Sequence, residues 1–177
     1  NAVPPLHYFV ADPTGDVLVV EYLEGKLVLH DGSVGVITNS PDYRWHLTNL
    51  RNYIGLRPLN DPSVNLQGVT LSQFGQGSGA MGLPGDFTPP SRFVRAVFLP
   101  QAVFPPANAG EGIDTAFHIL NQFDIPRGAL RDQQEGRVIA DATQWTCAAD
   151  LTNRRYTFHT LDNRAIRMVD LNRLNPE

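Results

Sequence analysis

The first 31 residues alternate short apolar runs with tight turns, and this alternation limits the fold more than any other feature of the chain. The runs cover residues 6–11, 17–22 and 27–30, and turn sequences at residues 12–16 and 24–26 separate them. β-Branched and aromatic residues favour strands, whereas Asp, Pro and Gly favour tight reversals of the chain. The pattern therefore predicts three short strands joined as an antiparallel meander.

A polar corner followed by a helix is predicted after this meander. Residues 34–37 are expected to form a short buried strand, and Asn39 or Ser40 is expected to cap a helix that has Pro41 at its first position. A carboxamide at such a corner is well placed to bind a ligand, but the local pattern alone favours a simple capping role for Asn39. The apolar face of the helix is formed by Tyr43, Leu47, Leu50 and Ile54.

The middle of the chain combines a long connection with a glycine-rich run. Residues 56–67 contain several Pro, Asn and Asp, and connections of this length are often functional or packed against another chain. A strand is expected at residues 69–74. Residues 75–80 formally fit the dinucleotide-binding fingerprint, but Pro84 and Gly85 follow too soon for the helix that this motif requires. The glycines are therefore expected to allow close backbone packing.

Two helices and then a series of strands are predicted for the remainder. The first helix is expected from Thr88 to about Pro100, with Arg92 and Arg95 on roughly one face. The second follows Gly112 and carries apolar residues at helical spacing, namely Ile113, Phe117, Leu120 and Phe123. Strands are expected at residues 138–142, 144–148, 156–160 and 166–171. Nothing indicates a second domain, so residues 1–177 are predicted to form a single domain.

Composition and charge limit the partners and cofactors. The formal net charge is −4 and the charged residues are interspersed, so no basic stripe favours nucleic acid. No apolar run approaches the ~18 residues that a membrane-spanning helix needs. The five histidines and the single cysteine, Cys147, show no ligand spacing, so neither a metal nor another cofactor is predicted. His46 is interpreted as a histidine that packs in the core or supports a neighbouring site residue.

Three blocks of the sequence carry a more specific pattern. The first runs from Thr38 to Tyr53, the second covers residues 74–79 and 82–95, and a weaker third covers residues 156–168. In this order, and over nearly the whole chain, they resemble the choloylglycine hydrolase family, and within it the penicillin V acylase branch. The resemblance implies an α+β fold with mostly antiparallel sheets. By this resemblance, the chain corresponds to the C-terminal half of a four-layer αββα sandwich, the fold of N-terminal-nucleophile hydrolases.

The same resemblance gives two residues a role in catalysis. Asn39 matches the asparagine whose side-chain N–H₂ helps to form the family's oxyanion hole, and Arg92 matches the arginine close to the nucleophile. The family's nucleophile is a cysteine at the start of the mature chain, with its own α-amino group as base. This chain begins Asn1-Ala2-Val3, so that cysteine is expected in an upstream half, which would be a partner of this chain. Asp86 is interpreted as a turn or helix-entry residue.

The implied activity is hydrolysis of a linear amide through a thioester, with a small-molecule amide as substrate. The substrate would join a hydrophobic acyl group to a small amine, as in a phenoxyacetyl β-lactam, an N-acyl homoserine lactone or a conjugated bile acid. Alone, the chain is expected to be inactive, and the resemblance implies a homo-oligomer, in particular a tetramer, in which residues 56–67 contact a neighbouring subunit. The alternatives are a nicked enzyme and a non-catalytic binding module that lacks the nucleophile. Periplasmic and cytoplasmic locations both remain open.

Overall fold

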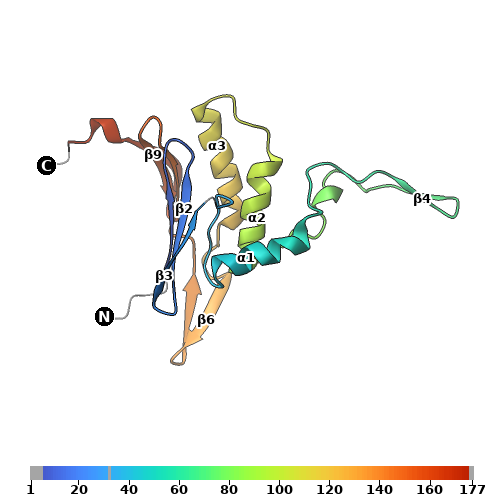
Figure 1. Cartoon of the computed structure of the whole chain (residues 1–177), viewed down its shortest axis with the longest axis horizontal. Coiled ribbons are helices and arrows are strands. Elements are labelled where there is room, and N and C mark those ends of the chain that lie inside the picture. Colours follow the sequence, from blue (N-terminus) through green and yellow to red (C-terminus); the bar gives the residue numbers. More distant parts are fainter. Residues whose placement is uncertain (1–5, 32, 176–177) are drawn as a thin grey trace. The chain divides into compact units, whose positions relative to one another are not determined.

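The computed structural model describes residues 6–31 and 33–175 (Figure 1). These residues belong to two compact units. The first unit spans Asn1–Phe104 and the second spans Pro105–Glu177. Each unit combines helices with antiparallel strands. The expectation that residues 1–177 form one domain stays a prediction.

The first unit begins with the predicted meander. Strands β1 (His7–Ala11), β2 (Val17–Leu23) and β3 (Lys26–Asp31) form an antiparallel sheet in the order β1-β2-β3. In the centre of the sheet, Val19 and Glu21 of β2 point to the same side and are fully buried. The prediction of three strands with short connections is confirmed.

Buried Glu21 is satisfied by three donors from different segments. His7 Nδ1 of β1 lies 3.0 Å from one carboxylate oxygen, and His30 Nε2 of β3 lies 2.9 Å from the other. The backbone N–H of Tyr43, the first residue of helix α1 (Tyr43–Leu50), donates to the same carboxylate at 2.9 Å. Such full pairing is what allows a carboxylate to be buried.

The corner before α1 differs from the prediction in three respects. Residues 34–37 form no strand, although Val36 and Ile37 still pack against the core. The N-cap of α1 is Asp42, whose carboxylate accepts a hydrogen bond from Trp45 N at 3.0 Å, so neither Asn39 nor Ser40 caps this helix. Pro41 precedes the N-cap, so it is not the first residue of the helix, and the Ser40–Pro41 peptide bond is cis.

Helix α1 also ends earlier than its apolar pattern predicts. It passes into a short 3₁₀-helix, η1 (Arg51–Tyr53), and Ile54 beyond it is 88% exposed. The inner face of α1 buries Tyr43, as predicted, and also His46. The core of this unit joins Val19, Tyr43 and Phe93, with Val36, Ile37, Leu47, Leu50 and Val97 partly buried around them.

A long excursion, residues 55–82, separates η1 from the next helix. Figure 1 shows its hairpin, β4 (Val64–Leu66) and β5 (Val69–Leu71), standing away from the helices of the same unit. The expected strand at residues 69–74 is therefore shorter than predicted. At the base of the excursion a 3₁₀-helix, η2 (Ser78–Ala80), contains buried Gly79, where an added Cβ would clash with the backbone carbonyl oxygens of Leu59 and Arg57. The glycine-rich run does permit close backbone packing, as predicted.

Helix α2 (Pro89–Ala102) completes the first unit and packs Phe93 and Val94 into the core. The second unit contains α3 (Ala109–Leu120), followed by η3 (Asn121–Phe123), and α3 lies against β8 (Trp145–Asp150). No helix in the described part of the chain is long and apolar enough to cross a membrane.

The sheets of the second unit are antiparallel throughout. Strand β8 pairs with β9 (Arg155–Thr160), which pairs with β10 (Asn163–Asp170); a short 3₁₀-helix, η4 (Leu171–Arg173), follows β10. A separate hairpin joins β6 (Leu130–Gln134) to β7 (Arg137–Asp141). Strand β6 was not predicted, because its sequence Leu-Arg-Asp-Gln-Gln lacks the apolar alternation of a half-buried strand.

Candidate active site

Asn39 lies on the irregular segment between β3 and α1 and is exposed. Since Asp42 caps α1, the helix start makes no demand on the Asn39 side chain. The carboxamide is therefore available for other interactions, in contrast to the capping role that its local sequence favours.

The Asn39 carboxamide forms a hydrogen bond with Arg92, which lies in the first turn of α2. Its Nη2 donates to Asn39 Oδ1 at 2.7 Å, and its Nε donates to the backbone carbonyl of Phe87 at 3.0 Å. The two residues are 53 positions apart in the sequence, yet the fold brings the two predicted site residues into direct contact. The hydrogen bond also orients the carboxamide: because the guanidinium occupies Oδ1, the Nδ2 amide group faces away from Arg92.

No acceptor among residues 6–31 and 33–175 forms a hydrogen bond with this Nδ2 group, so its two N–H donors are open to a ligand. Arg92 itself is partly buried, and the part of the chain that the structure describes provides it with no ion pair. Burial, and to a lesser extent the positive charge of Arg95, lowers the pKa of the Arg92 guanidinium from its ordinary value. A guanidinium remains protonated in proteins, so the site combines a fixed cation with an outward-facing neutral donor.

The start of α2, which carries Arg92, is held by Asp86. The Asp86 carboxylate accepts hydrogen bonds from Ser91 Oγ at 2.6 Å and from the backbone N–H of Thr88 at 2.9 Å, as well as from the Thr88 hydroxyl. These donors, with Ser91 first, lower the pKa of Asp86 to about 2. The interpretation of Asp86 as a helix-entry residue is confirmed.

His46 is the site residue that sequence reasoning left without a defined contact. The residue is buried, and its ring stacks on Phe93, the neighbour of Arg92, with ring centroids 4.6 Å apart and planes 8° from parallel. Its Nε2 lies 2.8 Å from the backbone carbonyl oxygen of Asn39. Only the position of His46 on the helix after Asn39 hinted at this contact, and the interpretation as a packing or supporting histidine is confirmed.

A second tie joins the same loop to α2. The Thr38 hydroxyl donates to the backbone carbonyl of Pro89 at 3.1 Å. Sequence reasoning missed this bond, since a threonine before an asparagine carries no signal for a partner 51 positions away. In the described part of the chain, no group of three or more His, Cys, Asp or Glu side chains is arranged to hold a metal ion.

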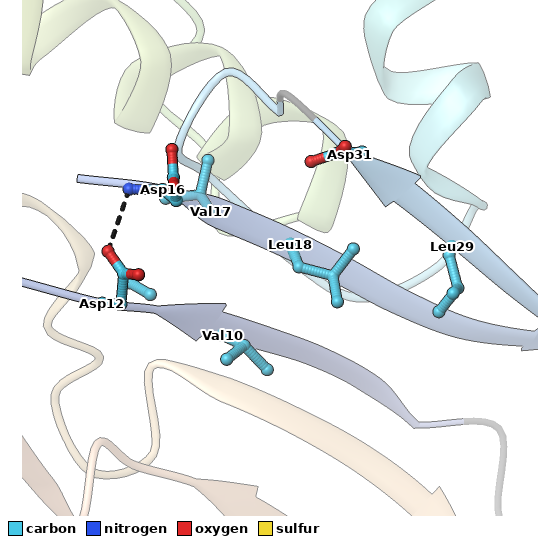
Figure 2. A pocket seen from close by; sticks show the side chains of 8 residues that line it. Val10, Asp12, Asp16, Val17, Leu18, Leu29 and Asp31 are labelled. Carbon is cyan, nitrogen blue, oxygen red and sulfur yellow. Dashed lines mark hydrogen bonds between the residues drawn. The ribbon is translucent and has the colours of Figure 1, made fainter. Parts of the chain in front are cut away.

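The first unit also contains a pocket at one end of its sheet (Figure 2). It has a volume of about 410 Å³ and is lined by apolar residues of the strands together with Asp12, Asp16 and Asp31. Asp12 already accepts a hydrogen bond from Asp16 N at 3.2 Å, which closes the β1–β2 turn. Neither Asn39 nor Arg92 lines this pocket, so it is separate from the pair described above.

Comparison with known protein families shows which family the chain belongs to. The linear amide C–N hydrolases of the choloylglycine hydrolase family match residues 1–176. The chain belongs to the choloylglycine hydrolase family. Its fold class is confirmed: the sheets of this chain are antiparallel, and the chain superposes on half of a conjugated bile acid hydrolase, an N-terminal-nucleophile hydrolase.

Three relatives show how far the likeness extends. A bile salt hydrolase/transferase from Clostridium perfringens is 41% identical over 96% of this chain and 51% of its own length. Penicillin V acylase from Pectobacterium atrosepticum is 30% identical over 96% of this chain and 42% of its own length. The crystal structure of a cysteine-to-alanine mutant of the Clostridium perfringens conjugated bile acid hydrolase matches with a TM-score of 0.80 and 36% identity, over 96% of this chain and 50% of that one. This choloylglycine hydrolase family chain thus spans about half the length of its relatives.

Proposed function

We propose that this chain supplies the oxyanion-stabilising part of an enzyme that hydrolyses linear amide C–N bonds. The observation that carries the proposal is the 2.7 Å hydrogen bond from Arg92 to Asn39 Oδ1, which leaves the Nδ2 donors of Asn39 facing outward. The guanidinium also polarises the carboxamide to which it donates, and this strengthens Nδ2–H as a donor. Membership in a family of linear amide hydrolases supports the same assignment.

The proposed reaction uses a cysteine nucleophile from polypeptide outside these 177 residues. Its thiolate adds to the amide carbonyl carbon, the C–N bond breaks as the leaving amine takes up a proton, and a thioester remains. Water then adds to the thioester, which releases the carboxylic acid and restores the thiol. Each addition places negative charge on the former carbonyl oxygen, and we assign Asn39 Nδ2 as a donor to that oxygen.

Arg92 is assigned a second task beside orienting Asn39. A permanent positive charge close to a cysteine favours the thiolate over the thiol and so lowers the thiol pKa. Arg92 suits this task because it is held by the Phe87 carbonyl and Asn39 and has no carboxylate counter-ion among the described residues.

The proposed substrate joins a hydrophobic acyl group to a small amine. The Trp45-His46 pair within the first resembling block favours the penicillin V acylase branch, and this preference stays a prediction. Identity is 41% to a bile salt hydrolase/transferase and 30% to a penicillin V acylase, which favours a conjugated bile acid as the first substrate to test. Penicillin V and an N-acyl homoserine lactone are the next two.

Two partners are proposed with this function. The first is the upstream half that carries the cysteine, in keeping with the coverage of about half of each relative. The second is another copy of the chain, in a tetramer, contacted through the excursion at residues 55–82. Its exposed apolar side chains support this role, and they include Leu59, Val64, Leu66, Val69, Leu71, Phe74 and Met81.

The substitution Asn39→Ala in the complete enzyme tests the assignment. It removes one oxyanion donor, so we expect kcat to fall ~10²–10³-fold, equivalent to ~3 kcal/mol, with little change in KM. Steady-state kinetics with a conjugated bile acid and with penicillin V measure both constants. An effect mainly on KM would instead assign Asn39 to substrate positioning and overturn the oxyanion role.

A further inference from the structure

The ring of His46 contacts both segments that carry the proposed site: the backbone of Asn39 and the Phe93 side chain next to Arg92. Its Nε2 is 2.8 Å from Asn39 O, and its face stacks on Phe93 at 4.6 Å, one residue after Arg92. One side chain of α1 therefore contacts both the loop with the proposed oxyanion donor and the helix with the proposed cation.

The direction of the hydrogen bond follows from its acceptor. A backbone carbonyl can only accept, so the proton lies on Nε2 and the ring donates to Asn39 O. The other nitrogen, Nδ1, is buried and makes no hydrogen bond within residues 6–31 and 33–175. The ring thus uses one nitrogen as a fixed donor and the other makes no competing polar contact.

Burial makes this donor rigid. His46 is 1% exposed, and its ring contacts two aromatic rings: it stacks on Phe93 and meets Trp45 nearly at right angles, with centroids 5.6 Å apart. By contrast, Asn39 is exposed on an irregular loop. An exposed loop residue needs an external restraint if its side chain is to meet a developing charge with fixed geometry, since a displacement of about 1 Å can remove much of the benefit.

We propose that His46 is a positioning residue for the oxyanion donor: its Nε2–H holds the Asn39 backbone so that the carboxamide can meet both Arg92 and the substrate oxygen. This inference rests on the function proposed above. It assigns His46 no proton transfer and no contact with the substrate.

Three substitutions in the complete enzyme separate the donor from the packing. His46→Phe keeps the aromatic stack on Phe93 but removes the N–H. His46→Gln places an amide N–H near the position of Nε2, whereas the matched control His46→Asn places it near the position of Nδ1. Loss of one buried hydrogen bond predicts a fall in kcat of about tenfold for His46→Phe and His46→Asn, with KM within about twofold, and substantial recovery in His46→Gln. Values of kcat are normalised to alkylatable active-site thiol, so unfolded protein does not count.

The decisive measurement combines these changes with Asn39→Ala. If His46 acts through Asn39, His46→Phe lowers kcat in the wild-type background and has almost no further effect once the Asn39 carboxamide is gone. Equal losses in both backgrounds would overturn the proposal, and so would better rescue by Asn than by Gln. Should Asn39→Ala itself leave kcat unchanged, the proposed function fails. Should Asn39→Ala lower kcat while His46→Phe does not, only the role of His46 fails.

Discussion

The Arg92 guanidinium combines three properties. It is partly buried, it donates hydrogen bonds to two acceptors, and it orients the neutral amide of Asn39. A lysine could supply the charge, but its single ammonium group cannot reproduce the fork that reaches both Phe87 O and Asn39 Oδ1. The site therefore depends on the shape of the arginine as well as on its charge.

We expect Arg92→Gln to raise the apparent pKa of the proposed nucleophilic thiol by about one unit, because the cation proposed to stabilise its thiolate is lost. We also expect kcat to fall ~10–100-fold, as for the loss of a charged hydrogen bond. The rate of thiol alkylation as a function of pH measures the first effect in the complete enzyme. Arg44→Gln removes the same charge from an exposed position on α1 and serves as the control. An equal shift in both variants would argue against a specific role for Arg92.

The pairing of Asn39 with Arg92 shows the limit of local sequence reasoning. Each residue, judged by its neighbours, fits an ordinary role in a cap or on a helix surface. Their contact spans 53 positions and was not predicted; only the family resemblance assigned both residues to one site. The contact from His46 to Asn39 O was missed for a related reason, since it depends on the path of an irregular loop that no periodicity encodes.

The start of helix α2 depends on Asp86, and this gives the stability of the protein a defined dependence on pH. The pKa of Asp86 is lowered to about 2 from an ordinary value of 3.8. A carboxyl whose folded pKa is lowered adds stability above its unfolded pKa, and that contribution disappears as the pH falls toward the folded value. The contribution of Asp86 should therefore be complete above about pH 4 and lost between about pH 4 and pH 2.

Urea unfolding of the complete protein at several pH values between 6 and 2 measures this contribution. We expect wild type to be more stable than Asp86→Asn at pH 6 and to lose that advantage over the window from about pH 4 to pH 2. Ser91→Ala removes the largest cause of the shift and should move the loss to higher pH. A difference between wild type and Asp86→Asn that stays constant with pH would contradict this account.

Helices and strands with a clear pattern were predicted well, and those without one were not. The meander of β1–β3 and helix α3 follow directly from turn chemistry and apolar spacing. Strand β6 was missed because it is polar, and the strand expected at residues 34–37 does not form, although Val36 and Ile37 are partly buried. Those apolar residues serve the core from an irregular segment, so burial alone did not imply a strand.

The excursion at residues 55–82 exposes more apolar surface than a short loop would need, and we expect it to stabilise an oligomer. Phe74 is fully exposed on it, and Phe104 provides a matched control because it is also exposed but lies outside the excursion. If Phe74 is a central contact, Phe74→Ser should weaken assembly by about 30-fold or more. Light scattering over a range of concentrations measures the mass. An equal loss of mass in Phe74→Ser and Phe104→Ser would argue against the excursion as the specific contact.

The isolated chain of 177 residues should release no amine from a conjugated bile acid or from penicillin V, because the proposed cysteine lies outside it. The same chain joined to its upstream half should be active, and Asn39→Ala in the joined protein is the control for background hydrolysis. Turnover by the purified isolated chain would contradict the proposed division of the site. It would also show that a group within residues 1–177 acts as the nucleophile.

The carboxylate of Glu21 connects four segments of the first unit. Two strands reach it through their histidines, its own strand lies between them, and the helix that follows the Asn39 loop begins with an N–H bound to it. Substitution of Glu21 should therefore disturb the neighbouring Asn39 loop as well as the sheet. In a mutational scan scored by turnover, position 21 should therefore be as sensitive to substitution as the proposed site residues. Val20 and Tyr22, on the opposite face of the strand, should tolerate substitution.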